Sequence, residues 1–259
     1  MRPESLDVYT GRLTVESATL GDFSVDVAAV ARLDAAVDVL WVTPKAYQLE
    51  AALALAPAAA VAGGRVVTLM NGIDHVATLR ARYGKVIAGA IRVESERIAP
   101  GHIRQTTQFV RVQLSAGSDI CTALTDAGIE CQVHPDGSSL LWQKLVFLAP
   151  VALATTAFGS TLGEVRDSEL FLRCQAEAVA VARAHGATID ESALQAATSA
   201  APAVLRSSMQ KDRAQGRPLE LDAIAGPIIR GGLDHQIPTP ATEELIALIT
   251  GGSLGGDQR

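Results

Sequence analysis

The sequence predicts an α/β protein in two parts, a parallel-sheet domain over residues 1–134 and an all-helical domain over 135–250. Strand-like and helix-like segments alternate through the first part, which is typical of parallel strands joined by right-handed crossovers. The run VDVLWVT at 37–43 is almost continuously apolar, as a central strand covered on both faces would be. The second part shows helical periodicity and no strand-like segment.

Each element of the first part follows from its local pattern. Apolar and polar residues alternate over 12–16 and 23–27, as in half-buried strands. Longer apolar stretches separated by helical patterns predict the remaining strands and helices. The further strands are expected at 37–43, 65–70, 85–93, 102–114 and 130–134, and the helices at about 46–61, 74–83 and 117–127.

The helical part begins where Asp136 or Ser138 can cap a long helix that runs to about Thr156. The tail at 251–259, GGSLGGDQR, is expected to be flexible. The other helices are expected at 164–185, 191–200, 202–215, 219–231 and 240–249.

Composition excludes several classes of protein. With 259 residues, 48% apolar and 19% charged, the chain can bury a large core. The net charge of −6 argues against nucleic acid as a partner. Three cysteines without a CxxC pair predict neither a disulfide framework nor a metal site, and they favour the cytoplasm. The polar start and the lack of a long apolar run predict no signal peptide and no membrane span.

A Gly-rich turn that cradles a pyrophosphate is not found in the sequence. No GxGxxG occurs, and Gly63-Gly64 precedes a predicted strand instead of following one. Such turns bind phosphates through backbone N–H groups and a helix N-terminus. We therefore expect the chain as given to bind a dinucleotide weakly or not at all.

Two polar residues follow predicted parallel strands. Lys45 lies in VTPKAYQ just after the central strand, and Asn71 lies in LMNGID just after the next strand. Ligands of α/β proteins commonly bind at the carboxyl ends of strands. Ordinary turn chemistry explains either residue equally well.

Lys144 stands on an apolar helical face with Leu140, Leu148 and Ala152, which are spaced by four. The lysine could extend along this face towards water. Alternatively, it faces a cleft between the two domains, where desolvation would suit it to proton transfer.

Further along, the string SSMQKDRAQGRPLELDAIAG at 207–226 places Ser208 on one helix and Glu220 in the first turn of the next. Glu220 either binds a ligand or only complements the helix dipole. Asp222 is expected to be a surface or capping residue.

Together, the strings VTPKAYQ, LMNGI, LLWQKLVF, SSMQKDRAQGRPLELDAIAG and HQIPTP resemble the ketopantoate reductase (2-dehydropantoate 2-reductase) family, in the family's order. The resemblance covers nearly the whole chain. It implies a Rossmann-like domain followed by a helical domain, NADPH as cofactor and reduction of a 2-keto acid. A homodimer through the helical domain is a further possibility.

The same resemblance implies roles for individual residues. Lys144 matches the general acid, and Glu220 matches a catalytic carboxylate that holds the substrate. Ser208 matches a ligand of the substrate carboxylate. Lys45 and Asn71 match residues at the nicotinamide end of the cofactor site, and Arg2 matches a basic residue that faces the 2′-phosphate. No metal is implied.

The chain also departs from the family pattern. Family members begin with a strand, a Gly-rich turn and a helix, so we expect this chain to be incomplete at its N-terminus and to lack the first βα unit. Leu148 and Ala152 stand where asparagines are common, which predicts a keto acid less polar than ketopantoate. Two alternatives stay open: a non-catalytic member that acts as a helical-domain dimer or small-molecule binder, and a related hydroxyacid dehydrogenase.

Overall fold

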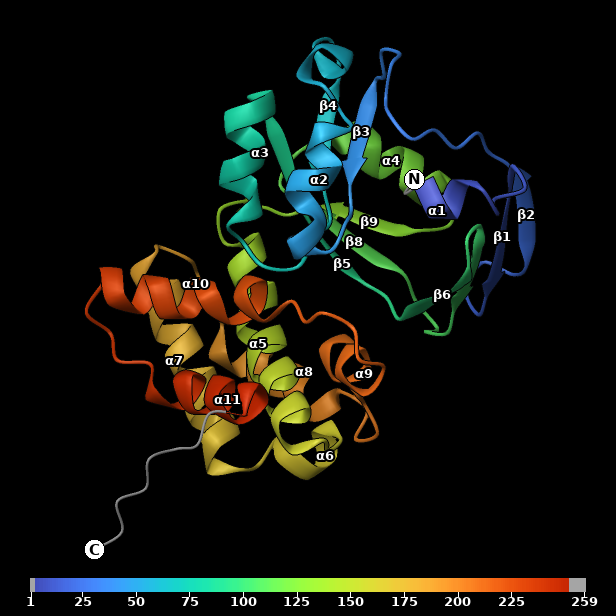
Figure 1. Cartoon of the computed structure of the whole chain (residues 1–259). Coiled ribbons are helices and arrows are strands. Elements are labelled where there is room, and N and C mark those ends of the chain that lie inside the picture. The colour runs from blue at the N-terminus through green and yellow to red at the C-terminus, as the bar shows by residue number, and fades with distance from the viewer. Residues whose placement is uncertain (1–2, 252–259) are drawn as a thin grey trace, which may run out of the picture. The chain divides into compact units, whose positions relative to one another are not determined.

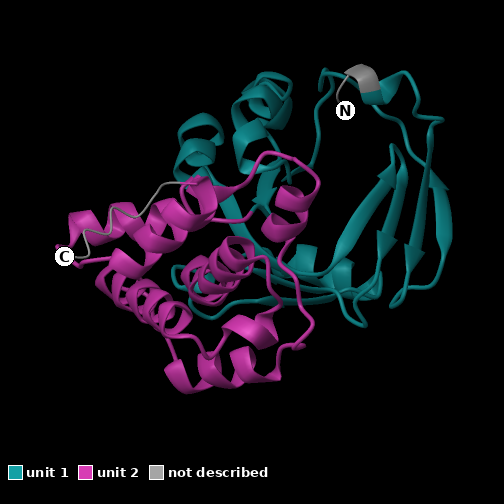
Figure 2. Cartoon of the chain, turned by 60° about the horizontal axis from the view of Figure 1, so that its bottom comes forward, with its two compact units in different colours: residues 1–70, 75–140 teal, residues 71–74, 141–259 magenta. Residues whose placement is uncertain are grey.

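The computed structural model describes residues 3–251. It divides the chain into two compact units, residues 1–70 with 75–140 and residues 71–74 with 141–259 (Figure 2). The short segment 71–74, which follows a strand of the first unit, thus belongs to the second. Arg2 and the tail beyond residue 251 lie outside the described residues.

The main sheet of the first unit has five strands in the order β3-β4-β5-β8-β9. The strands β3, β4 and β5 are parallel, as the alternating pattern predicts, whereas β8 runs antiparallel to β5. The last strand, β9, is parallel to β8. Their bounds are β3 Val39–Val42, β4 Arg65–Thr68, β5 Val86–Arg92, β8 Arg111–Leu114 and β9 Glu130–Val133.

Helices cover both faces of this sheet (Figure 1). On β4, Val66 packs into a core with α2 (Leu49–Ala54) and α3 (His75–Tyr83). Its neighbour Val67 points to the opposite core, which includes residues of α4 (Ser118–Asp126). Successive side chains of a strand point to opposite faces, so an apolar pair such as this one requires two covered faces.

A second sheet in the first unit has the order β2-β1-β7-β6. The segment 102–114, expected as one strand, is divided between the two sheets, with β7 in this sheet and β8 in the main one. Side-chain hydrogen bonds from Gln105 to Thr107 form the bend between them. Sequence patterning did not predict β6. The bounds are β1 Arg12–Ser17, β2 Phe23–Asp26, β6 Ser95–Ala99 and β7 His102–Gln105, with a short helix α1 at Pro3–Leu6.

The predicted helix at 46–61 is three shorter pieces: η1 (Ala46–Gln48), α2 and η2 (Ala58–Val61). Pro57 causes the second break, because its ring restricts the preceding residue and cannot continue a helix. The last two pieces still bury Leu49, Leu53 and Val61 in one core.

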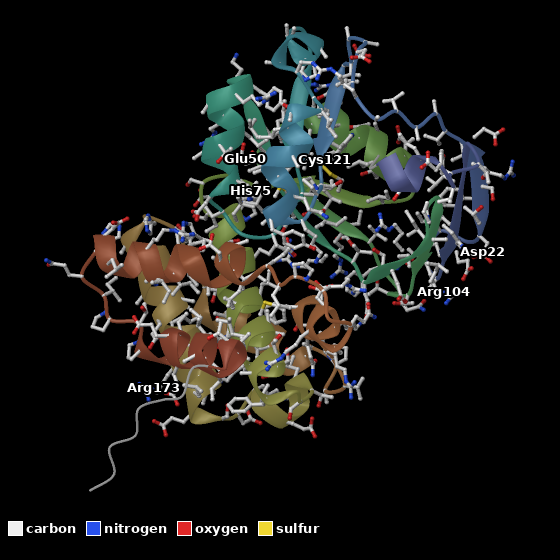
Figure 3. All side chains as sticks on the ribbon, viewed as in Figure 1. Asp22, Glu50, His75, Arg104, Cys121 and Arg173 are labelled. Carbon is white, nitrogen blue, oxygen red and sulfur yellow. A yellow bond between two sulfur atoms is a disulfide. The ribbon has the colours of Figure 1, made fainter. Side chains whose placement is uncertain are left out.

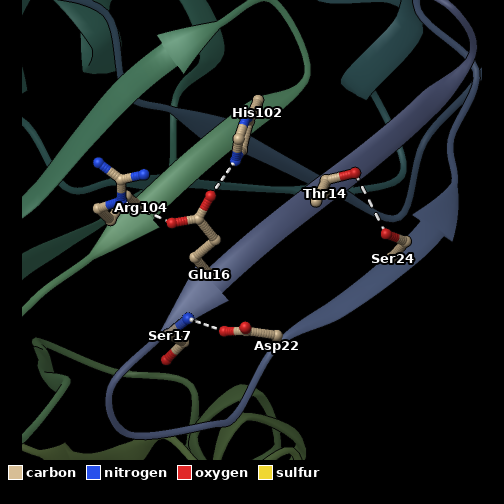
Figure 4. Close-up of polar contacts among 7 residues, drawn as sticks. All are labelled: Thr14, Glu16, Ser17, Asp22, Ser24, His102 and Arg104. Carbon is tan, nitrogen blue, oxygen red and sulfur yellow. Dashed lines mark hydrogen bonds and ion pairs between the residues drawn. The ribbon is translucent and has the colours of Figure 1, made fainter.

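A charged cluster joins β1 to β7 in the second sheet (Figure 4). Glu16 Oε1 lies 2.6 Å from His102 Nε2, and Glu16 Oε2 accepts from Arg104 Nε at 2.6 Å. The Arg104 hydrogen bond and then the His102 hydrogen bond hold the pKa of Glu16 below its ordinary value. The cluster therefore favours the ionised carboxylate in the folded state.

We expect this cluster to contribute to acid sensitivity. A carboxylate whose pKa is lower in the folded state stabilises the fold above its unfolded pKa, and this contribution is lost as pH falls through the folded pKa. Thermal unfolding midpoints measured from neutral pH down through about pH 4, the range of an unfolded glutamate, should fall less steeply for Glu16→Gln than for wild type. Exposed Glu50 of α2, labelled in Figure 3, supplies the control Glu50→Gln. Identical pH profiles for Glu16→Gln and wild type would contradict the assignment.

The structure differs from the sequence-based expectation at two cysteines. Cys121 of α4 and Cys131 of β9 form a disulfide, with Cα atoms 4.9 Å apart (Figure 3). Packing of α4 beside β9 brings them together, and a spacing of ten residues alone does not reveal such a pair. The third, Cys174, is free and buried, and burial raises the pKa of its thiol to about 12.

The second unit is helical throughout its described residues and is built around α5. Its core combines buried side chains of α5 with those of α7, α10 and α11, including Phe171, Ile228 and Leu245. The predicted helix at 202–215 begins only at Ser208, and the one at 164–185 is two helices that meet at a Ser168 cap. The bounds are α5 Leu140–Phe158, α6 Leu162–Val165, α7 Glu169–Ala184, α8 Glu191–Ala200, α9 Ser208–Ala214, α10 Leu221–Asp234 and α11 Pro240–Thr250.

Helix α5 is long and apolar enough to cross a membrane by length and composition alone, and it is the only such helix among residues 3–251. However, 72% of that stretch is buried inside the protein. A central core helix passes the same test, because a helix that is apolar all round also suits the middle of a bundle. The helix is therefore weak evidence for a membrane span.

Candidate functional site

Lys144 lies in the second turn of α5, between the buried Leu140 and the half-buried Leu148. Its ammonium donates a hydrogen bond of 2.9 Å from Nζ to Oδ1 of Asn71. Most of the surrounding helix faces the core, so the ammonium is the polar group on a largely apolar surface. Lys144 is therefore held by a specific partner within the second unit.

Asn71 connects the lysine to a carboxylate. While its Oδ1 accepts from Lys144, its Nδ2 donates to Oε2 of Glu220 at 3.4 Å, which is a long hydrogen bond. An amide is suited to this position because it carries an acceptor and a donor on one rigid plane. Lys144, Asn71 and Glu220 thus form a hydrogen-bonded series, which we call the Lys–Asn–Glu series.

Glu220 is the N-cap residue of α10, and only 5% of it is exposed. Its side chain makes no capping hydrogen bond to the helix, although an N-cap carboxylate commonly does so. Instead the carboxylate reaches Asn71. A buried carboxylate that leaves the helix end uncapped is positioned for contact with a partner other than its own helix.

The segment 71–74 is fastened to α10 at two points. Asp74 and Asp222 both pair with Arg230, at 2.5 Å and 2.7 Å. Gly72 has a φ of +84°, and a Cβ there would lie 2.3 Å from the carbonyl oxygen of Ala223. This backbone conformation and close approach both require glycine. The two contacts fix the backbone on either side of Ile73 and thereby position Asn71.

The two serines before α9 have different environments. Ser207 is buried and caps the helix by accepting from the backbone N of Gln210, and it also bonds to Thr155 Oγ1 at 2.8 Å. Ser208, the predicted substrate ligand, is exposed at the first residue of α9. Within residues 3–251, no hydrogen bond joins Ser208 to any member of the Lys–Asn–Glu series.

The predicted cofactor residues fall in three different places. Lys45 is half-buried in the first unit, in the turn after β3 and at the N-cap of η1. Asn71 follows β4, which is parallel to β3, but belongs to the second unit and engages Lys144 and Glu220. Arg2 lies outside the described residues.

Sequence patterning did not single out Gly72, Asp74 or Arg230, which hold Asn71 in place. The Asn-Gly dipeptide was a usable signal for Gly72, because glycine readily adopts positive φ. No local signal pairs Asp74 with Arg230, because 156 residues separate them. Asp222, expected at the surface, is exposed and pairs with the same arginine.

The Lys–Asn–Glu series is suited to reactions that build negative charge on an oxygen atom and then protonate it. A lysine ammonium can stabilise negative charge on an oxygen atom and donate a proton to it. A neighbouring buried carboxylate can accept hydrogen bonds from a bound hydroxyl or amide. An α/β unit followed by a helical unit with such a lysine is compatible with an oxidoreductase that reduces a carbonyl group.

Comparisons with known proteins give the family. The family described as "Ketopantoate reductase PanE/ApbA" matches residues 4–118, and "Ketopantoate reductase PanE/ApbA C terminal" matches residues 138–252. A 2-dehydropantoate 2-reductase of Caulobacter vibrioides is 30% identical over 232 residues, covering 85% of this chain and 79% of that protein. One of Mycobacterium tuberculosis is 28% identical over 228 residues, covering 85% and 77%.

Solved structures agree in fold. The 2-dehydropantoate 2-reductase of Geobacter metallireducens superposes with a TM-score of 0.85 at 23% identity, covering 98% of this chain and 90% of that one. A D-mandelate dehydrogenase crystallised with NADH and anilino(oxo)acetate gives 0.81 at 18% identity, covering 93% and 84%. The two family matches and the 30% identical relative show that the chain belongs to the ketopantoate reductase family, whose named members here are oxidoreductases. The expected fold class, a Rossmann-like domain followed by a helical domain, is confirmed.

Proposed function

We propose that the protein reduces a 2-keto acid to the 2-hydroxy acid with NADPH as the hydride donor. The observation that carries the proposal is the Lys–Asn–Glu series, in which Asn71 joins the Lys144 ammonium to the buried carboxylate of Glu220. Family membership supplies the reaction class, and the named relatives are 2-dehydropantoate 2-reductases.

In the proposed mechanism, Lys144 is the general acid. Reduction breaks the C=O π bond and builds negative charge on the carbonyl oxygen. The Lys144 ammonium stabilises that charge and transfers a proton from Nζ to the oxygen, which becomes the product hydroxyl. Solvent then returns a proton to the amine. NADPH, when bound, supplies the hydride that forms the new C–H bond.

Asn71 and Glu220 have supporting roles in this scheme. Asn71 Oδ1 holds the Lys144 ammonium in one place, so Asn71 acts as a positioning residue. Glu220 accepts from Nδ2 of Asn71, and it can accept a hydrogen bond from the hydroxyl that forms on the product. Ser208 is proposed to donate to the substrate carboxylate from the start of α9.

The residues present suit the nicotinamide end of the cofactor better than its pyrophosphate. An ammonium at Lys45 and an amide at Asn71, each following a parallel strand, have the donor chemistry to line the nicotinamide end. The turn after β3 contains Pro44, which lacks an N–H, and no glycine occurs between Gly21 and Gly63. We therefore assign no described residue to the pyrophosphate, and weak NADPH binding by this chain stays a prediction.

The substrate is proposed to carry an aliphatic side chain. Leu148 is half-buried and Ala152 is buried on α5, one and two turns after Lys144. Neither can donate a hydrogen bond from its side chain, whereas the polar hydroxyl of ketopantoate would need a partner if it were buried. Branched aliphatic 2-keto acids therefore suit this surface better.

The test has two arms. Calorimetry measures binding of 2-ketoisovalerate and ketopantoate to the chain without cofactor, and steady-state assays with NADPH in excess measure turnover over the same acids. We expect keto-acid binding, and we expect turnover only where NADPH is concentrated enough to fill a weakly binding cofactor site, with 2-ketoisovalerate preferred. Binding without turnover would favour the non-catalytic alternative, whereas no binding of any 2-keto acid would refute the site assignment.

Glu220→Ala is expected to act mainly on substrate affinity. The proposed task of Glu220 is to hold Asn71, and through it Lys144, in the geometry that binds the keto acid in both the ground state and the transition state, and loss of such uniform binding raises KM with little change in kcat. Loss of a hydrogen bond to a charged group, roughly 1.5–3 kcal/mol, corresponds to about a 10- to 100-fold rise in KM. Exposed Glu191 of α8 supplies the control Glu191→Ala. A fall in kcat at unchanged KM would assign Glu220 to the chemical step instead.

A cytoplasmic location and a homodimer through the helical unit stay predictions. Light scattering of the purified chain measures the oligomeric state directly.

A further inference from the structure

We propose that a cavity formed by the C-terminal end of α5 together with α9 binds a small organic anion that also carries a hydroxyl group. The cavity lies entirely within the second unit and has a volume of about 460 Å³. Ligand pockets for small molecules commonly have volumes of 300–1,000 Å³. We call it the α5–α9 cavity; it is lined by Thr156, Ala157, Phe158, Gly159, Arg206, Gln210, Lys211, Arg213 and Ala214.

Three cationic side chains line the α5–α9 cavity: Arg206, Lys211 and Arg213. The whole chain carries a net charge of −6, so this is a local concentration of positive charge on an acidic protein. Arg213 Nη1 donates to the carbonyl oxygen of Thr156 at 3.0 Å, which anchors one side of its guanidinium at the cavity. Guanidinium groups have several donors and bind carboxylates and phosphates well.

Two acidic residues flank this cationic lining. Glu164 interacts electrostatically with Arg206, but its Oε2 already accepts from Thr161 N at 2.7 Å and Thr161 Oγ1 at 2.9 Å. Asp212 pairs with Arg217 at 2.7 Å. The cavity lining itself includes no acidic residue.

Two buried polar atoms on the lining have no hydrogen-bond partner. Thr156 is 1% exposed and Gln210 is 7% exposed, yet Thr156 Oγ1 and Gln210 Oε1 are both unpaired. The Gln210 amide is oriented by its Nε2, which donates to the carbonyl oxygen of Ser160 at 3.1 Å. The preceding residue, Thr155, is fully bonded to Val151 O and Ser207 Oγ. Buried polar groups normally find partners, and an unpaired one costs free energy.

The unpaired atoms specify the ligand more closely than charge alone. Both atoms are buried in this structure, so a ligand reaches them only when the two side chains turn into the cavity; Thr156 would then donate to an anionic oxygen, and Gln210 Oε1 would accept from a donor such as a hydroxyl. Ala157, Phe158 and Ala214 provide an apolar surface for a short carbon skeleton. Hydroxy carboxylates and phosphate monoesters share this chemistry, since each presents anionic oxygens and can carry a hydroxyl.

This cavity is separate from the proposed reductase site. Lys144, Asn71, Glu220 and Ser208 are not among its lining residues. Lys144 and Thr156 lie on the same helix, and twelve residues at 1.5 Å each place them about 18 Å apart along its axis. Shared elements α5 and α9 connect the two places, so an anion bound here would contact the helices that carry Lys144 and Ser208.

Calorimetry on the full chain tests the proposal with four probes. Glycerol 3-phosphate and 2-hydroxyisovalerate carry both required groups, whereas isovalerate lacks the hydroxyl and glycerol lacks the charge. We expect at least one of the first two to bind at least tenfold more tightly than isovalerate and glycerol, and to bind less tightly as salt rises. The probe whose binding is weakened by Arg206→Gln identifies phosphate or carboxylate as the source.

Variants separate this cavity from the reductase site. Arg206→Gln should weaken binding by roughly 10- to 100-fold, as expected for a lost charge-assisted hydrogen bond. The matched control Arg173→Gln, at an exposed residue of α7 (Figure 3), should not change it. Lys144→Ala should leave binding here intact, while it impairs the reductase reaction.

Thr156→Val provides an independent readout that requires no ligand. Replacing an unpaired buried hydroxyl by a methyl group removes a desolvation penalty, so the thermal midpoint should rise by a few degrees while anion binding is lost. Thr155→Val, at a fully bonded hydroxyl, should lower the midpoint instead. No binding by either hydroxylated probe, or binding unchanged in both Arg206→Gln and Thr156→Val, would overturn the proposal.

Discussion

Lys144→Ala should lower kcat and kcat/KM together by 10²- to 10⁴-fold, roughly 3–5 kcal/mol of barrier. The proposed ammonium acts on charge that is present mainly in the transition state, so its loss affects both constants equally. Steady-state kinetics with NADPH in excess and 2-ketoisovalerate as substrate measure the effect. Calorimetric affinity for the keto acid should change much less than the rate.

The control for this variant is Lys85→Ala, because Lys85 is an exposed lysine of the first unit. It tests whether loss of a positive charge alone alters the rate. If Lys144→Ala retained the wild-type kcat, Lys144 would have no part in proton transfer. If Lys144→Ala raised only KM, the ammonium would be a substrate ligand and another group would be the general acid.

Gly72→Ala should destabilise the second unit and disrupt the Lys–Asn–Glu series. A left-handed conformation costs a non-glycine residue about 1–2 kcal/mol, and a Cβ only 2.3 Å from the carbonyl oxygen of Ala223 forces the backbone to move as well. At about 2–4 °C per kcal/mol for a chain of this size, the thermal midpoint should fall by at least several degrees. Turnover should fall too, since Asn71 is the adjacent residue.

A second glycine separates backbone strain from the close contact. Gly186 has a φ of +81°, and nothing lies within 4 Å of a Cβ built there. Gly186→Ala therefore carries only the conformational cost and should leave turnover unchanged. Equal midpoints for the two variants, together with wild-type turnover in Gly72→Ala, would show that the α10 contact does not position Asn71.

The order of strands and helices was largely predictable from local patterns. An apolar run such as 39–42 indicates a strand covered on both faces, and an amphipathic stretch such as 169–184 indicates a helix, because side-chain direction in a helix repeats every 3.6 residues. Lys144 was identifiable for the same reason, as the charged residue on an apolar helical face. Glu220 and Asn71 were assigned through family resemblance instead.

Other features were decided only by tertiary structure. Local periodicity does not show that 102–114 divides between two sheets, because strand pairing depends on partners far along the chain. It also does not pair Cys121 with Cys131, or Asp74 with Arg230.

In the candidate site, too, some features were predictable from the sequence and others depend on the tertiary structure. The residue types at 71, 144 and 220 are visible in the sequence, but the bridging role of Asn71 depends on hydrogen bonds across 73 and 149 residues. The sequence also does not show that the side-chain oxygens of Thr156 and Gln210 lack hydrogen-bond partners. Thr155 and Thr156 are the same residue type at adjacent positions, and only packing gives the Thr155 hydroxyl its partners. Tertiary packing decides which buried polar groups have hydrogen-bond partners, because the fold must bring donor and acceptor within about 3 Å of each other.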